Sequence, residues 1–104
     1  MDATATAARP AHPTGSVAAA IAERLVAQLR PTALAVTNDS HHHAGHSGDD
    51  GTGETHFSVA VESPSFAGLS RVARQRLVNA ALADLLAGPI HALAIRARAP
   101  GEGA

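Results

Sequence analysis

Histidine is the residue type in this chain that is most able to do chemistry. The chain has seven histidines and no cysteine among 104 residues. His41, His42, His43 and His46 fall in one stretch rich in Gly and Asp, and His91 follows a Gly-Pro pair. Neutral imidazole is a common metal ligand, and without cysteine the chain offers no thiolate to a metal and no thiol catalysis. By spacing alone, His91 reads as a histidine at a strand end that hydrogen-bonds locally and the loop histidines read as solvated residues, although flexible imidazoles also take up Zn²⁺ or Ni²⁺ adventitiously.

The length of the chain allows one domain to position these histidines. We expect a disordered tail over residues 1–15, a domain over residues 16–98 and a C-terminal tail over residues 99–104. Aromatic residues are nearly absent, with two Phe and no Tyr or Trp, so the core must be small and built from Leu, Val and Ile.

The first half of the domain reads as one helix and two strands. Ser16 is a suitable N-cap, apolar residues then recur at a spacing of four, and Pro31 stops the helix. Alternating apolar residues predict strands over Thr32–Thr37 and His56–Glu62. The long histidine-rich loop between them has no periodicity, which is typical of a functional or disordered loop, and the two strands are expected to form an antiparallel hairpin.

The second half begins with a turn or single helical turn around Gly68, followed by the longest helix. Ser70 is its expected N-cap, the helix is predicted over Arg71–Ala87, and Gly88 suits the left-handed position after its end. Its apolar face is predicted to consist of Val72, Leu77, Leu82, Leu85 and Leu86, with alanines between them.

A last strand is predicted over Ile90–Ala97, and its alternation places His91 on one face with Leu93 and Ile95. The element order is then α-β-β-α-α-β with a short first α after the second strand. This order predicts an α+β fold of two layers, in which a three-stranded mixed sheet carries its helices on one face.

The charge pattern excludes several classes of function. Net charge is −1 and all eight basic residues are arginines, so bulk electrostatics does not indicate a polyanion partner. Arg71, Arg74 and Arg76 open the longest helix, as in an ordinary solvated helix face, but their positive charge opposes the helix dipole and this mildly favours an anionic partner. No nucleophile with a base, phosphate loop or carboxylate pair is present, so we expect no enzyme.

No run of apolar residues is long enough to span a membrane, and the first residues lack the features of a secretory signal. A cytoplasmic protein without membrane contact is therefore expected.

Four segments together resemble the BolA family: NDSHHHAGH, GETHF, FAGLSRVARQRLVNAAL and LAGPIHALAI. The resemblance extends over roughly residues 20–100 and its motifs keep their order and spacing. It implies a fold similar to class II KH domains. One departure from KH domains is that S-P-S-F-A-G stands where a G-x-x-G loop would clamp RNA.

The resemblance also implies a partner and a cofactor. BolA-like proteins pair with monothiol glutaredoxins and share a [2Fe–2S] cluster with the glutaredoxin cysteine and a bound glutathione. The G-P-x-H histidine, His91, is the implied ligand, and the second comes from the loop, with His46 preferred and His43 as the alternate. His56 is expected to support the site or to cap its strand rather than to ligate.

Two other functions stay open. The resemblance equally implies a DNA-binding transcriptional regulator of stress response and cell morphology, which would use Arg71, Arg74 and Arg76. A generic interaction domain with an incidental histidine-rich loop is the third possibility. A homodimer is a further possibility when no partner is present.

Overall fold

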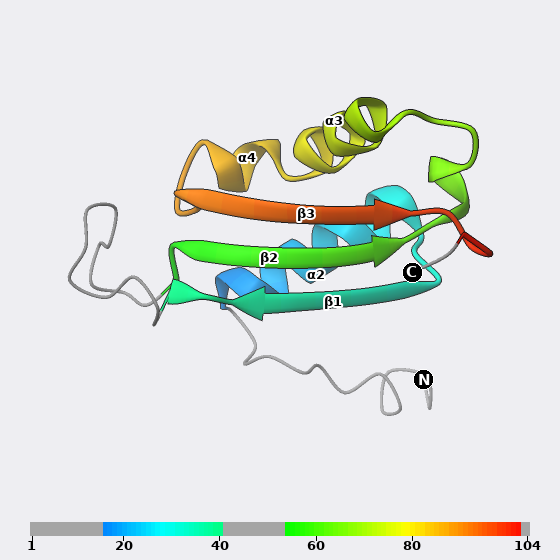
Figure 1. Ribbon diagram of the computed structural model, residues 1–104. Coiled ribbons are helices and arrows are strands. Elements are labelled where there is room, and N and C mark those ends of the chain that lie inside the picture. Colours follow the sequence, from blue (N-terminus) through cyan, green and yellow to red (C-terminus); the bar gives the residue numbers. More distant parts are fainter. Residues whose placement is uncertain (1–15, 41–53, 103–104) are drawn as a thin grey trace, which may run out of the picture.

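The computed structural model describes residues 16–40 and 54–102. Its elements follow the order helix α2 (Val17–Leu29), strands β1 (Ala33–Asn38) and β2 (His56–Glu62), the 3₁₀ turn η2 (Pro64–Phe66), helices α3 (Arg71–Ala81) and α4 (Ala83–Leu86), and strand β3 (Ala92–Arg98) (Figure 1). No helix among these residues has the length and apolar character needed to cross a membrane.

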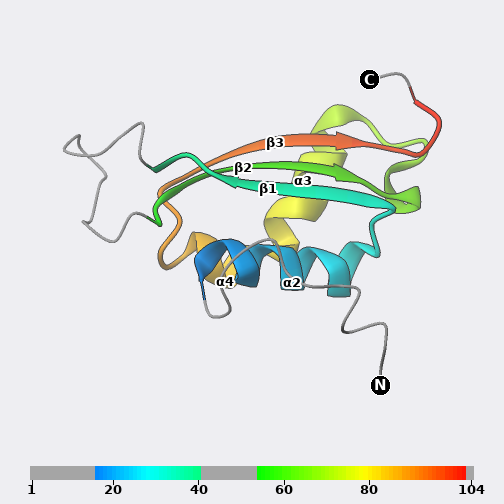
Figure 2. The ribbon, with the colours of Figure 1, turned by 90° about the horizontal axis from the view of Figure 1, so that it is seen from below.

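The three strands form one mixed sheet in the order β1-β2-β3. β1 pairs antiparallel with β2, with Val36 opposite Val59, and β2 pairs parallel with β3, with His56 opposite Ala92. The helices lie together on one face of the sheet, and the other face is open (Figure 2). The predicted α+β class, the hairpin and the single helical layer are confirmed, and the arrangement is consistent with a class II KH-like fold.

The core lies between the sheet and the helices. Alternation along β2 turns Phe57, Val59 and Val61 toward the helices, where each is at most 3 % exposed. The spacing of four in α2 buries Ile21 and Leu25 completely against them. The remaining core side chains that are no more than 5 % exposed are Ala18, Leu29, Phe66, Val78, Leu82, Ile90 and Ala99.

The long helices begin as the sequence predicts. The hydroxyl oxygen of Ser16 accepts a hydrogen bond from the Ala19 amide at 3.0 Å, and that of Ser70 accepts one from the Ala73 amide at 3.1 Å. At the end of α2, Arg30 takes the left-handed conformation with φ 46°, and its amide donates to the Val26 carbonyl.

The prediction of one helix over Arg71–Ala87 is wrong. Leu82 leaves the helical conformation with φ −108° and ψ 15°, which separates α3 from α4. The side chain of Leu82 is fully buried at this break. The predicted left-handed conformation of Gly88 is also wrong, because among the described glycines positive φ occurs at Gly68 and Gly101. At the end of α4, the Leu85 carbonyl instead accepts hydrogen bonds from the amides of Gly88 and Ile90.

The predicted apolar face of α3 needs one correction. Val72 is 56 % exposed, whereas Val78, which the prediction left out, is fully buried. The eleven-residue helix meets the core near its C-terminal end, so apolar residues in its first turn project away from the core.

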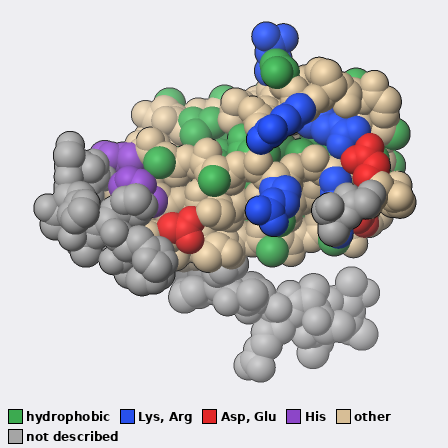
Figure 3. Space-filling view, viewed as in Figure 1, with side chains coloured by type: hydrophobic (Ala, Val, Ile, Leu, Met, Phe, Trp, Pro, Cys, Tyr) green, Lys and Arg blue, Asp and Glu red, His purple; other side chains and the backbone are tan. Residues whose placement is uncertain are grey.

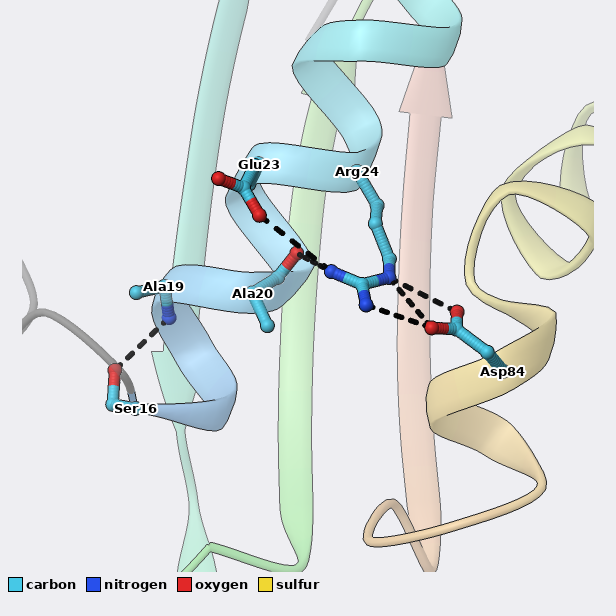
Figure 4. Close-up of polar contacts among 6 residues, drawn as sticks. All are labelled: Ser16, Ala19, Ala20, Glu23, Arg24 and Asp84. Carbon is cyan, nitrogen blue, oxygen red and sulfur yellow. Dashed lines mark hydrogen bonds and ion pairs between the residues drawn. The ribbon is translucent and has the colours of Figure 1, made fainter.

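A bidentate ion pair joins α2 to α4 on the helical side of the molecule (Figure 4). Arg24 Nε lies 3.0 Å from Asp84 Oδ1, and Arg24 Nη2 lies 2.7 Å from Asp84 Oδ2. The hydrogen bond from Arg24 lowers the pKa of the Asp84 carboxyl. This pair gives the short α4 a fixed position beside the longer α2.

Candidate functional site

His91 lies in the turn between α4 and β3, with its side chain exposed. The preceding residue, Ile90, is buried in the core, and the His91 amide donates to the Thr55 carbonyl at 2.8 Å. The prediction that His91 shares a face with Leu93 and Ile95 is wrong, because His91 precedes the strand and those two side chains are half-buried toward the helices.

His56 is the histidine that the structure brings to His91. The centroids of their rings are 6.3 Å apart, with an angle of 43° between the ring planes. His56 opens β2 and Ala92 opens β3, and these two residues are register partners in the parallel pair. Parallel strands that start together therefore bring the two imidazoles to the same end of the sheet, a proximity that sequence spacing did not reveal.

A buried polar cluster of Ser40 and Thr55 holds this end together. The Ser40 hydroxyl accepts hydrogen bonds from the Thr55 amide at 2.8 Å and the His56 amide at 3.0 Å. The Thr55 hydroxyl shares a 2.8 Å hydrogen bond with His56 Nδ1, and the Thr55 carbonyl accepts the amides of His91 and Ala92. Ser40 is 2 % exposed and Thr55 is fully buried, so the bond between the Thr55 amide and the Ser40 hydroxyl is sheltered from water, and the bonds to His56 are partly sheltered.

The same cluster joins the two sides of the histidine-rich loop. Ser40 precedes the loop and Thr55 follows it, and between them His41, His42, His43 and His46 lie outside the described residues. Next to Thr55, Glu54 Oε2 accepts a 2.6 Å hydrogen bond from the Val17 amide, which connects the loop's second side to the start of α2. Both places where the loop leaves the domain are thus fixed beside His91.

The two imidazoles that the structure brings together could contribute to a metal centre. The ring centroids are 6.3 Å apart, which is wider than two imidazoles on one tetrahedral metal ion with metal–nitrogen bonds of about 2 Å, so one ring would have to move for both to ligate the same ion. A hydrogen bond at one ring nitrogen, as Thr55 provides to His56, orients an imidazole for ligation through the other. Residues 16–40 and 54–102 contain no cluster of three or more His, Asp or Glu side chains placed to hold a metal.

The three predicted anion-contact arginines all lie on α3 and differ in their surroundings. Arg71 and Arg74 line a groove of about 540 Å³ between α3 and β3, whereas Arg76 is exposed and does not line it. Arg74 makes a bidentate pair with Glu102, with Nη1–Oε1 and Nη2–Oε2 distances of 2.6 and 2.7 Å.

Glu102 belongs to the segment predicted as a tail, yet it contacts the domain. The hydrogen bond from Arg74, with a second from the Ala99 amide, lowers the pKa of the Glu102 carboxyl to about 2. Ala99 is itself buried. A second carboxylate nearby, Glu62, has its pKa lowered by the Thr32 hydroxyl and by Arg98, whose Nε lies 2.9 Å from Glu62 Oε2.

Histidines and arginines thus occupy different ends of the molecule. Histidine side chains gather where β2 and β3 begin, and arginine side chains lie over the middle and the opposite half of the same face (Figure 3). We call the first region, with Ser40, Thr55, His56 and His91, the histidine end. We call the second, with Arg71, Arg74, Arg96, Arg98 and Glu102, the arginine end.

Comparison with known proteins agrees with this geometry. The family model described as BolA-like protein matches residues 25–102. BolA-like protein 1 of Homo sapiens is 51 % identical over 88 residues, which cover 85 % of this chain and 61 % of that protein, so the chain spans less than two thirds of this relative. The DNA-binding transcriptional regulator BolA of Vibrio cholerae is 49 % identical over 75 residues, covering 72 % of this chain and 67 % of that protein.

Among solved structures, BolA1 from Arabidopsis thaliana superposes with a TM-score of 0.78 and 36 % sequence identity. The match covers 88 % of this chain and all of the Arabidopsis chain. On the fold, the motifs around the histidines and these matches, the chain belongs to the BolA family.

Proposed function

We propose that this chain is a non-enzymatic partner of a monothiol glutaredoxin and shares a [2Fe–2S] cluster with it and a bound glutathione, in iron–sulfur trafficking or iron and redox regulation. The observation that carries the proposal is the exposed His91 beside the two points where the histidine-rich loop leaves the domain. An exposed ligand next to a ligand-bearing loop suits a centre that is completed by a second protein.

The donor set of the chain supports this assignment. It has no cysteine, so thiolates for one iron must come from the partner and from glutathione. Imidazoles from this chain would serve the other iron, and replacing thiolates by neutral histidines raises the reduction potential of such a cluster. Ligation by histidine requires the neutral ring, so a cluster held in this way is sensitive to acid, as a transfer or sensing role requires.

His91 is the first ligand in this proposal. The second is His46, or His43 as its alternate, and His56, whose ring lies 6.3 Å from that of His91 between centroids, is placed to support the site. The hydrogen bonds of Ser40 and Thr55 would keep the ligand end of β2 and β3 in place whichever loop histidine binds.

A titration of this protein into a cluster-loaded monothiol glutaredoxin with glutathione tests the proposal through visible circular dichroism. The wild type should change the spectrum at one-to-one stoichiometry, and His91→Ala should not. Parallel titrations of His46→Ala, His43→Ala and His56→Ala identify the second ligand, and His12→Ala, in the predicted tail, is the matched control. An unchanged spectrum with the wild-type protein would refute the cluster-sharing function.

A DNA-binding regulator is the second candidate function. The Vibrio cholerae relative bears that name, and two of the predicted contact residues, Arg71 and Arg76, are exposed on α3. This function predicts an affinity for duplex DNA that falls steeply with salt and depends on Arg71 and Arg76 but not on His91. Gel-shift titrations at two salt concentrations, with alanine variants of Arg71, Arg76 and His91, would separate the DNA-binding function from the cluster-sharing function.

A further inference from the structure

The outer edge of β3 is available for pairing with another strand. Within the described chain, β3 pairs with β2 on one side, and the Ser63 amide at the end of β2 donates to the Arg98 carbonyl at 3.0 Å. Because backbone groups alternate in direction along a strand, residues 92, 94, 96 and 98 face β2. The amides and carbonyls of Leu93, Ile95 and Ala97 therefore point to the outer side.

That outer side borders the groove between α3 and β3. The groove has a volume of about 540 Å³ and is lined by Leu69, Arg71, Arg74, Gln75, Ile95, Arg96, Ala97 and Glu102. Residues of α3 line one side of the groove and residues of β3 the other, and the ribbon shows α3 beside β3 (Figure 1). Apolar side chains, outward backbone groups and arginines thus lie along one channel.

Glu102 shows which chemistry the groove accepts. Its carboxylate forms the bidentate pair with Arg74, and Oε1 also accepts the Ala99 amide at 3.0 Å. Ala99 directly follows the last residue of β3. One carboxylate therefore already binds both an arginine of α3 and the backbone amide that follows the strand.

The unused charge of the groove is positive. Arg71 and Arg96 have no ion-pair partner among residues 16–40 and 54–102, and both side chains are exposed. We propose that the groove binds an extended acidic segment of a partner protein, which adds to the outer edge of β3 as a strand and places carboxylates on Arg71 and Arg96.

Other occupants fit the groove less well. A second copy of this chain, paired through its own β3 edge, would bring the same unpaired arginines toward one another. Duplex DNA would satisfy the arginines but cannot match backbone amides spaced every two residues along an extended strand. The outward amides of Leu93, Ile95 and Ala97 require the regular backbone of a peptide.

A synthetic peptide in which glutamate and valine alternate is the probe. We expect it to bind the intact protein in a fluorescence titration, and to bind about 5-fold more weakly to Arg71→Ala and to Arg96→Ala. Arg76→Ala removes a positive charge from α3 outside the groove. The affinity of this variant for the peptide should therefore stay within about 2-fold of the wild-type affinity. Circular dichroism of each variant shows that folding is retained.

Amide hydrogen exchange supplies the decisive readout. Peptide binding should protect the amides of Leu93, Ile95 and Ala97, while those of Ala92, Ala94 and Arg96, already directed to β2, change little. N-methylation of every second peptide amide should abolish binding when the methylated amides are those that face β3. It should leave binding intact when the methylated amides are those that face away. The proposal would be overturned by any of three results. The acidic peptide fails to bind, the protected amides do not alternate along β3, or a lysine–valine peptide binds equally well. Protection of the same amides by duplex DNA but not by the peptide would assign the groove to nucleic acid instead.

Discussion

The histidine end and the arginine end sit at opposite ends of the parallel pair β2 and β3, and they are held together by different forces. At the histidine end, neutral hydroxyl and backbone groups bond to one another around the buried Ser40 and Thr55. At the arginine end, charged side chains pair near the surface, as Arg74 does with Glu102 and Arg98 with Glu62.

The difference suits the two proposed roles. The proposed cluster needs His91 as a neutral ring, and the hydroxyl and backbone groups of Ser40 and Thr55 hold this end of the sheet through uncharged hydrogen bonds. The proposed acidic segment needs positive charge, which remains at Arg71 and Arg96 after Glu102 has paired with Arg74. The two ends can therefore be disturbed separately, and their responses to mutation should differ in size and in dependence on pH.

The largest effect is expected for Ser40→Ala. It removes the acceptor of the Thr55 and His56 amides in a site that is 2 % exposed, and each buried amide left without a partner is costly. We expect a loss of about 2–4 kcal/mol in the free energy of unfolding, measured by urea denaturation. Ser65→Ala, at an exposed serine, is the control and should change little. Equal urea midpoints of unfolding for Ser40→Ala and Ser65→Ala would show that the Ser40 hydroxyl is dispensable for stability.

Thr55→Val should have a smaller effect, because the side chain keeps its shape and loses one hydroxyl. The bond from the Thr55 hydroxyl to His56 Nδ1 disappears, at a cost of about 1 kcal/mol in unfolding free energy. Cross-peaks between the His56 and His91 rings in NMR spectra should weaken as the His56 ring gains freedom. Thr37→Val, on the exposed side of β1, provides the comparison. Unchanged ring cross-peaks in Thr55→Val would mean that packing alone orients His56.

Glu102→Gln should destabilise the arginine end in a way that depends on pH. The folded-state pKa of Glu102 is about 2, below the ordinary value of 4.5, so its ionised form stabilises the fold above that ordinary value. This contribution is lost as pH falls from about 4.5 through about 2. Melting temperatures should therefore differ between wild type and variant at pH 7 and converge near pH 2. In an Arg74→Gln background the Glu102 substitution should lower the melting temperature by less. A difference in melting temperature between wild type and Glu102→Gln that stays constant with pH would argue against the ion pair.

The smallest effect on stability is expected for His91→Ala. The side chain is exposed and its contribution to the histidine end lies in the backbone amide, so the free energy of unfolding should change by no more than about 0.5 kcal/mol. The same variant should still lose the spectral response to a cluster-loaded glutaredoxin. A large loss of stability would show that the His91 side chain is structural, and this outcome would break the contrast between a presented ligand and its buried support.

Much of the fold could be read from local sequence. Ser16 and Ser70 cap their helices because a side-chain oxygen can satisfy a first-turn amide wherever the chain turns helical. The alternation of Phe57, Val59 and Val61 determined which face of β2 is buried. Motifs around His91 were also local, so the family and the position of His91 after the Gly-Pro break were accessible without coordinates.

Tertiary structure decided the remainder, because these features depend on contacts between distant segments. The parallel pairing of β2 with β3 brings His56 to His91, and the return of the chain after β3 brings Glu102 to Arg74. Packing against the sheet, rather than helical periodicity, buried Val78 and left Val72 in solvent. Local patterns therefore determined the elements and their caps, whereas the neighbours of each functional side chain were determined only when long-range burial and strand register placed those elements together.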